Sequence, residues 1–173
     1  EWMAANPATT GILDPVDQNA EDWIEIHNPT TAPVSLDGWH LSDDPTERLK
    51  FPIPDGFIIP ANGFILIWAD DEPLQNAPTL RQEIHTNFKI SAAGESIILT
   101  APDTSKIDEV SFADQTSGIA RIRTIDGSDL FTYSLSPTPG RTNGIPPDRE
   151  AVEVTIAFPF ITFPSNPGEV YEI

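Results

Sequence analysis

The sequence predicts an all-β fold: a β-sandwich followed by a C-terminal β extension. Eighteen prolines and ten glycines are spread through the 173 residues, which argues against long helices. Short strand-like runs recur between turn residues at intervals typical of an all-β sandwich. The clearest run, Asp22–His27, alternates polar and apolar residues and stops at Asn28-Pro29, as a strand ending in a turn would.

The expected strands are short and are separated by turn-forming residues. In chain order they cover residues 22–27, 34–41, 49–51, 63–69, 83–90, 96–100, 107–112, 118–123 and 130–133. We interpret the first of them and residues 38–44 as the two halves of a hairpin. Residues 64–68 are the most apolar run, so we expect a central strand buried on both faces. Ile107 and Val110 are out of phase, which favours a β-bulge.

The connections carry turn signals of their own. Pro54-Asp55-Gly56 predicts a tight turn, because glycine readily adopts positive φ. Residues 92–95 are expected to close a hairpin between 88–90 and 97–99. Residues 70–82 contain two prolines and are expected to form a surface loop or a short helical turn.

Composition narrows the class of protein. Hydrophobic residues make up 39% of the chain and charged residues 21%, which is enough for a packed core. Nine basic residues against 27 acidic ones give a net charge of −18, which repels nucleic-acid phosphates and anionic membranes. The absence of cysteine excludes disulfides, thiolate metal sites and cysteine nucleophiles. No apolar run approaches the roughly 20 residues of a membrane span, so we expect no membrane-spanning segment.

The domain organisation follows from a change in composition near residue 140. We expect a sandwich domain over residues 1–144, a linker over 145–149 and an extension over 150–173. The extension contains a strictly alternating run, Val152-Glu153-Val154-Thr155-Ile156. It is interpreted as the first strands of a following β module or as a strand that pairs with the sandwich edge. The chain begins within an apparent element and shows no signal peptide, so we interpret it as a fragment of a longer protein.

Seven segments follow one another in the order of a known family pattern. They are residues 1–6 (EWMAAN), 22–30 (DWIEIHNPT), 34–44 (VSLDGWHLSDD), 51–70 with its FP and IPANGFILIWAD pieces, 85–95 (HTNFKISAAGE), 107–112 (IDEVSF) and 137–143 (PTPGRTN). Together they resemble the lamin tail domain, an immunoglobulin-like β-sandwich that also occurs in bacterial surface and secreted proteins. Residues 119–123 depart from the pattern, which usually has Gly-Arg there.

The resemblance implies a non-catalytic structural or interaction module. Eukaryotic relatives form the tail of nuclear intermediate filaments and contact proteins and DNA. This chain has no coiled-coil heptads, and its charge argues against DNA binding. We therefore expect an accessory domain of a larger bacterial protein at the cell surface or outside the cell. Its expected partners are proteins or neighbouring domains of the same chain, with no nucleic acid and no cofactor.

Acidic pairs are the candidates for acid–base chemistry or for Ca²⁺ binding. They are Asp43/Asp44, Asp70/Asp71 and, in an early loop, Asp14/Asp17. No segment has the Asp-x-Asp-x-Asp-Gly spacing of a Ca²⁺ loop, and adjacent acids arise often in so acidic a chain. We expect solvated or structural roles and assign no catalytic, cofactor-binding or metal residue. A Ca²⁺-stabilised adhesion module stays open as an alternative.

The three histidines would form a zinc site only if they converged with a further ligand. They are His27, His40 and His85, of which His27 and His40 alternate with apolar neighbours and are therefore expected on the exposed side. Neither Gly-x-Ser-x-Gly nor a glycine-rich phosphate loop is present, so the sequence offers no motif for nucleophilic catalysis or phosphate binding.

The four tryptophans, Trp2, Trp23, Trp39 and Trp68, suggest either core packing or a sugar-stacking platform. Trp39 shares parity with Leu41 and is expected in the core. Trp23 shares a face with Glu25 and His27 rather than with the isoleucines beside it, so we expect it to be half-exposed. An exposed Trp23 would favour the alternative of a carbohydrate-binding module with a glycan ligand.

Overall fold

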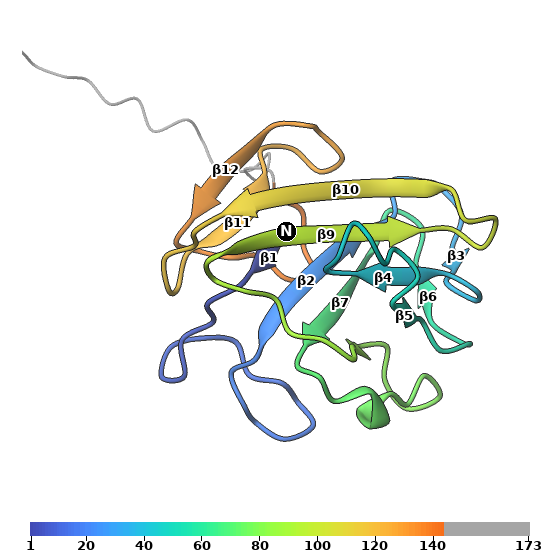
Figure 1. Cartoon of the computed structure of the whole chain (residues 1–173), viewed down its shortest axis with the longest axis horizontal. Helices are drawn as coiled ribbons and strands as arrows, with labels where there is room; N and C mark the ends of the chain where they lie inside the picture. The colour runs from blue at the N-terminus through green and yellow to red at the C-terminus, as the bar shows by residue number, and fades with distance from the viewer. Residues whose placement is uncertain (144–173) are drawn as a thin grey trace, which may run out of the picture.

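The computed structural model describes residues 1–143, and nearly all of their regular structure is β-strand (Figure 1). The elements are β1 (Trp2–Met3), β2 (Asp22–His27), β3 (Val34–Ser35), β4 (His40–Ser42), β5 (Phe51–Pro52), β6 (Ile58–Ile59), β7 (Phe64–Ala69), the 3₁₀-helix η1 (Pro73–Gln75), β8 (Ile84–His85), β9 (Gly94–Thr100), β10 (Lys106–Ala113), β11 (Ala120–Arg123) and β12 (Phe131–Ser134).

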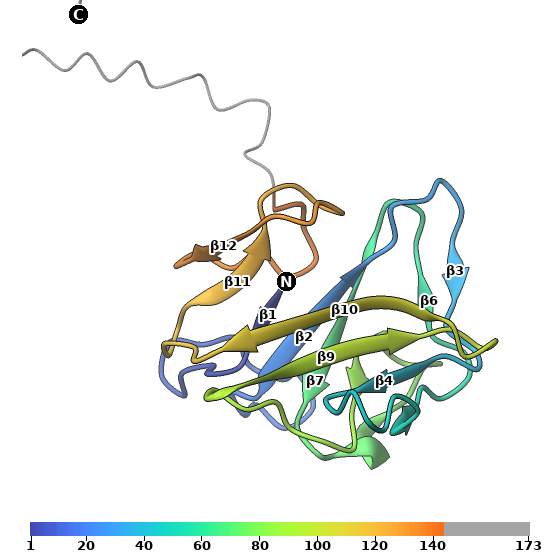
Figure 2. The ribbon, with the colours of Figure 1, turned by 45° about the horizontal axis from the view of Figure 1, so that its top comes forward.

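Two sheets form the sandwich. The larger has the order β12-β11-β1-β2-β7-β8, the smaller has the order β10-β9-β4-β5, and β3 and β6 pair separately. Every pairing is antiparallel except that of β7 with β8. In Figures 1 and 2 the β9–β10 ribbon crosses over β2 and β7, with the β11–β12 hairpin at one side and β3 and β6 at the other.

The main core lies between the sheets and is built by strand alternation. Ile24 of β2 and Ile65 and Ile67 of β7 point inward from the larger sheet, and Ile97 and Leu99 of β9 meet them from the smaller one. Loop residues complete this core, including the fully buried Phe57 and Leu36. The all-β sandwich that the sequence predicts is thus confirmed.

Several element predictions are confirmed in detail. β2 has the predicted bounds, and β7 lies between β2 and β8 with apolar side chains buried on both of its faces. The pairing of β10 with β9 shifts register between Lys106 and Asp108, which is the predicted bulge. The turn at Gly56 has φ of +99°, and η1 is the short helical turn expected within residues 70–82.

The predicted hairpin between residues 22–27 and 38–44 is wrong. β2 pairs with β1 and β7, whereas β4 pairs with β5 and β9 in the opposite sheet. The segment that follows β2 leaves the larger sheet, and hydrogen bonds from the Asn28 side chain fix its path. The Asn28 side-chain amide donates to the carbonyls of Ala32 (2.8 Å) and Pro60 (2.9 Å), which directs the chain toward the pairing of β3 with β6.

The predicted hairpin, in which residues 92–95 join 88–90 to 97–99, is also wrong. Residues 97–99 lie in β9, which does not pair with residues 88–90. β9 pairs with β10 on one edge and with β4 on the other. Residues 88–90 instead contribute Phe88 and Ile90 to the main core, and Lys89 forms an isolated bridge with Asp70. Of the strand expected over 83–90, only β8 is present as a strand.

The linker over 145–149 and the extension over 150–173 lie outside the described residues. Within residues 1–143, no helix has the length and apolar character needed to cross a membrane.

Candidate functional site

A second buried layer covers the outer face of the larger sheet, on the side away from the main core. Met3, Trp23, Trp68 and Ala120 form this layer, and Ile12 packs against them from the loop that precedes β2. Trp23 and Trp68 are direct partners in the pairing of β2 with β7, with 0% and 1% of their surfaces exposed. The loop of residues 5–21, here called the covering loop, therefore buries a face that alternation alone would leave to solvent.

The prediction of a half-exposed Trp23 is consequently wrong, although the parity behind it is right. Trp23 does point opposite to Ile24, but the covering loop packs on that side. Trp2 lies in the main core. Trp39 is half-buried and packs against the main core, so the prediction that Trp39 is a core residue is confirmed only in part. The described residues thus supply no exposed tryptophan platform for a sugar ring.

Asn6 fixes the covering loop by bonding across its base. Its side-chain amide donates to the carbonyls of Ile12 (2.6 Å) and Glu21 (2.8 Å), and its side-chain oxygen accepts the backbone N–H of Ile12 (3.1 Å). Gly11 passes so close to the Asn6 side chain that a Cβ at this position would collide with it. Side-chain bonds to the backbone thus hold the loop in place of a strand ladder.

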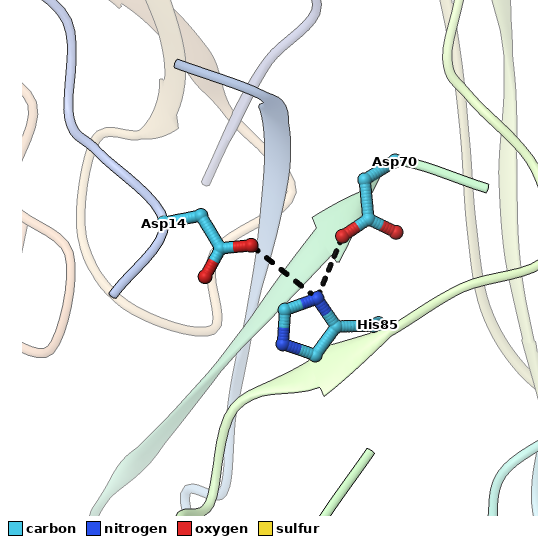
Figure 3. Close-up of side chains that lie close together, drawn as sticks. All are labelled: Asp14, Asp70 and His85. Atoms are coloured by element: carbon cyan, nitrogen blue, oxygen red, sulfur yellow. Dashed lines mark hydrogen bonds and ion pairs between the residues drawn. The ribbon is translucent and has the colours of Figure 1, made fainter. Parts of the chain in front are cut away.

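Asp14, Asp70 and His85 meet beneath this loop (Figure 3). Asp14 comes from the covering loop, Asp70 directly follows β7, and His85 ends β8. His85 Nδ1 lies 2.6 Å from Asp70 Oδ2 and 3.6 Å from Asp14 Oδ2. At most 2% of the surface of any of the three residues is exposed. Within residues 1–143, they are the only group of His, Asp and Glu whose ligand atoms converge closely enough for one ion.

Backbone contacts orient each member of the cluster. Asp14 Oδ1 accepts the N–H of Val16 (2.8 Å), and Asp70 Oδ1 accepts the N–H of Glu72 (3.0 Å). Each carboxylate therefore has one oxygen held by the backbone and turns the other toward the imidazole. Asn76 brackets the backbone of His85, accepting its N–H (3.0 Å) and donating to its carbonyl (2.7 Å).

Two carboxyl groups and one imidazole share the buried cluster, so the acidic groups outnumber the basic one. Burial raises the pKa of Asp14, and the N–H of Val16 and the charge of His85 oppose that shift. Asp14 Oδ2 and His85 Nε2 have no hydrogen-bond partner among the described residues. Buried polar atoms are nearly always hydrogen-bonded, so both atoms are free to take a further partner.

The other residues singled out in the sequence do not join this cluster. Asp43 accepts two bonds from Lys50 (2.6 and 2.8 Å), and Asp44 caps the turn at Thr46. Asp71 is exposed. Asp17, expected beside Asp14, is also exposed and bonds to Asn19.

His27 and His40 are half-buried rather than exposed, so that prediction is wrong. The ring of His27 stacks on that of Phe64 (4.6 Å between centroids), which shields part of its surface. Within residues 1–143, the three histidines do not converge on one zinc site. Only His85 belongs to a group of possible metal ligands.

A cavity of about 360 Å³ opens between the sheets near the β11–β12 hairpin. Apolar side chains such as Ile24 and Leu99 line its interior, and Glu25, Asp126 and Arg123 lie at its wall. Burial raises the pKa of Glu25 to about 7, against the opposing bond from the N–H of Gly140. Arg123 is already engaged by Asp108 (2.6 Å) and by the carbonyl of Ser128. The cavity therefore has an apolar interior, and the charged side chains at its wall already form hydrogen bonds within the protein.

Comparison with known proteins identifies a family but no individual relative. The family model described as Lamin Tail Domain matches residues 8–114. The matched span includes most of the covering loop, the strands β2 to β10 and all three members of the buried cluster, whereas β1, β11 and β12 lie outside it. A search of curated proteins found no match.

Proposed function

Because the chain belongs to the lamin tail domain family, we propose that it is an interaction and positioning module of a larger secreted or cell-surface bacterial protein. The family is one of immunoglobulin-like domains and is not known for catalysis. A module of this kind acts through its surface, so the proposal depends on where the described surface is suited to contact another segment or domain.

The β11–β12 hairpin carries this proposal. β12 is an edge strand of the larger sheet, with β11 on one side and no partner strand within residues 1–143 on the other. Four apolar side chains are largely exposed on this hairpin: Ile125 (68%), Leu130 (70%), Tyr133 (63%) and Leu135 (80%). Single exposed apolar residues are common, but an apolar hairpin at an open edge is typical of a surface that pairs with another strand.

The chain itself supplies the best candidate for that strand. The described residues end beside the hairpin, where the N–H of Asn143 bonds to Asp126 Oδ1 (2.9 Å). Upstream, the backbone N–H and hydroxyl of Thr138 both bond to the carboxylate of Glu1, which holds this end of the domain. The alternating run over residues 152–156 begins nine residues after Asn143. We propose that the alternating run 152–156 within the extension over 150–173 pairs with the β12 edge, and that the rest of the extension leads away from it.

Hydrogen exchange on the full 173-residue chain tests the pairing. In an antiparallel pair, alternate residues direct their N–H groups away from the partner strand, so an open β12 leaves part of its amides unprotected. We expect every amide of β12 to be protected in the wild type. Val154→Pro removes a strand donor from the middle of the alternating run and should release the outward amides by at least about tenfold.

Val170→Pro, outside that run, is the matched control and should leave β12 protected. Fast exchange of the outward amides in the wild type would contradict the pairing. The same conclusion would follow if Val154→Pro and Val170→Pro had equal effects.

The cellular setting is tested separately, by protease treatment or antibody labelling of intact cells that produce the full-length protein. An exposed location would be contradicted if protease left the protein intact and the antibody failed to label intact cells.

Two further partner classes make different predictions. A net charge of −18 should prevent retention of duplex DNA in a gel shift even at low salt, and tight salt-sensitive binding would contradict the proposed partner class. A glycan ligand would need an aromatic platform other than Trp23, which is fully buried. Glycan binding is therefore not part of the proposal.

A further inference from the structure

The cluster of Asp14, Asp70 and His85 brings three possible ligand atoms close enough together to hold one metal ion. We propose that it binds one divalent transition-metal ion, for which Zn²⁺ is the best fit. Asp14 Oδ2, Asp70 Oδ2 and His85 Nδ1 all lie within 4.8 Å of one another and come from three separate segments of the chain. This inference concerns the interior of the domain and does not depend on the proposed interaction function.

The unpartnered oxygen of Asp14 points to a ligand. Asp14 is 0% exposed, and its Oδ2 faces His85 Nδ1 across 3.6 Å without a hydrogen bond (Figure 3). The imidazole carries at most one proton on Nδ1, and the distance of 2.6 Å directs that proton to Asp70. No hydrogen-bond donor among the described residues then reaches Asp14 Oδ2, and a buried carboxylate oxygen without one is costly. A cation between the three atoms would satisfy all of them at once.

The spacing of the ligand atoms fits zinc with a small adjustment. Two ligands bound tetrahedrally at about 2.0–2.1 Å lie about 3.3 Å apart. The observed separations from His85 Nδ1 are 2.6 and 3.6 Å, on either side of that value. Moving Asp70 Oδ2 away from the ring by about 0.7 Å would open the site, and Asp14 is already near its place.

Charge and ligand type select the ion. Two carboxylates and a neutral imidazole neutralise a divalent cation, which suits a centre that is buried from solvent. A mixed nitrogen and oxygen set is typical of Zn²⁺, whereas Ca²⁺ takes six to eight oxygen ligands. With three protein ligands, a tetrahedral Zn²⁺ would keep one coordination position for a further ligand such as water.

A metal in this position would fasten the covering loop to the sheet. Asp14 belongs to that loop, while Asp70 and His85 belong to the neighbouring ends of β7 and β8. The same loop buries Trp23 and Trp68. Metal binding should therefore stabilise the outer layer in particular, and it should raise the melting temperature by about 5 °C or more at saturating Zn²⁺.

The test uses the full chain, stripped with chelator, loaded with Zn²⁺ and passed through gel filtration. We expect the wild type to retain about one equivalent of zinc and Asp14→Asn to retain less than about a tenth of that. Asp17→Asn is the matched control, because it removes the same charge from an exposed position in the same loop. It should retain zinc as the wild type does.

Co²⁺ provides a readout that needs no variant. A site with one nitrogen and two carboxylate ligands should give the visible absorption of tetrahedral Co²⁺, displaced by one equivalent of Zn²⁺. Failure of the wild type to retain zinc, or equal retention by wild type and Asp14→Asn, would overturn the proposal. If Asp14→Asn does not fold, the wild-type Co²⁺ spectrum decides, and its absence at saturating Co²⁺ overturns the proposal. Stabilisation by Ca²⁺ but not by Zn²⁺ would also overturn it.

Discussion

The Glu25 carboxylate on β2 accepts the backbone N–H of Gly140, which lies 115 positions further along the chain. Glu25 is 7% exposed, so this bond holds the last described turn of the domain against a strand in the middle of the larger sheet. The arrangement places an ionisable group where its charge is poorly solvated, and this has a measurable consequence for stability.

Glu25 should make the domain less stable as the pH rises from about 4.5 to about 7. Burial raises its pKa to about 7 in the folded protein, from an ordinary value of 4.5. In that window the unfolded chain releases the proton while the folded chain keeps it, so the free energy of unfolding falls with rising pH. The loss should be on the order of 3 kcal/mol when complete. Glu25→Gln should remove this part of the pH dependence, as measured by urea denaturation at pH 5 and pH 8.

Glu47→Gln is the control, because Glu47 is exposed. Its curve should follow that of the wild type. A Glu25→Gln variant that loses the same stability at both pH values would show that the buried carboxylate gives no such pH dependence.

Trp23→Ala should strongly destabilise the domain. Trp23 is fully buried in the outer layer opposite Trp68, and removal of such a ring costs about 3–5 kcal/mol. Leu74→Ala serves as the control, since Leu74 is 99% exposed and its loss should change stability by less than about 0.5 kcal/mol. Chemical denaturation measures both, and a small effect of Trp23→Ala would contradict the packing of the covering loop.

Asn28→Ala should loosen the crossing between the sheets. The buried Asn28 side chain donates to the carbonyls of Ala32 and Pro60 and accepts the N–H of Thr30 (3.0 Å), so its removal breaks three bonds that hold this connection. We expect a loss of about 2–3 kcal/mol in the free energy of unfolding, with faster amide exchange around β3 and β6. Asn87→Ala, at an exposed asparagine, should have little effect. Equal effects of the two substitutions would count against this role.

Gly94→Ala and Gly127→Ala separate steric collision from backbone strain. Both glycines have positive φ, +107° and +78°. A Cβ at Gly94 would lie 2.7 Å from the carbonyl oxygen of Phe112, whereas one at Gly127 would have no heavy atom within 4 Å. Gly127→Ala should therefore cost about 1 kcal/mol, and Gly94→Ala clearly more, because it also pushes β9 and β10 apart. Thermal melting compares them, and equal shifts would contradict the close approach.

Local patterns in the chain predicted several of the strands and the facing of their apolar side chains. Asp22–His27 is a strand with the predicted bounds, Ile24 points to the main core, and the mismatch between Ile107 and Val110 marks a true bulge. These features depend on the period of two in a β-strand and on turn residues, which act over a few positions. The ordered family segments added the sandwich architecture, and the match over residues 8–114 confirms the family.

The tertiary structure alone decided which strands pair and which faces are buried. β2 and the predicted second half of its hairpin belong to opposite sheets because pairing depends on contacts between segments far apart in the chain. Trp23 has the parity read from the sequence, but a loop outside its strand buries it. Asp14, Asp70 and His85 come together for the same reason: the parallel pairing of β7 with β8 and the folding of the covering loop set their distances, and neither depends on their spacing in the sequence.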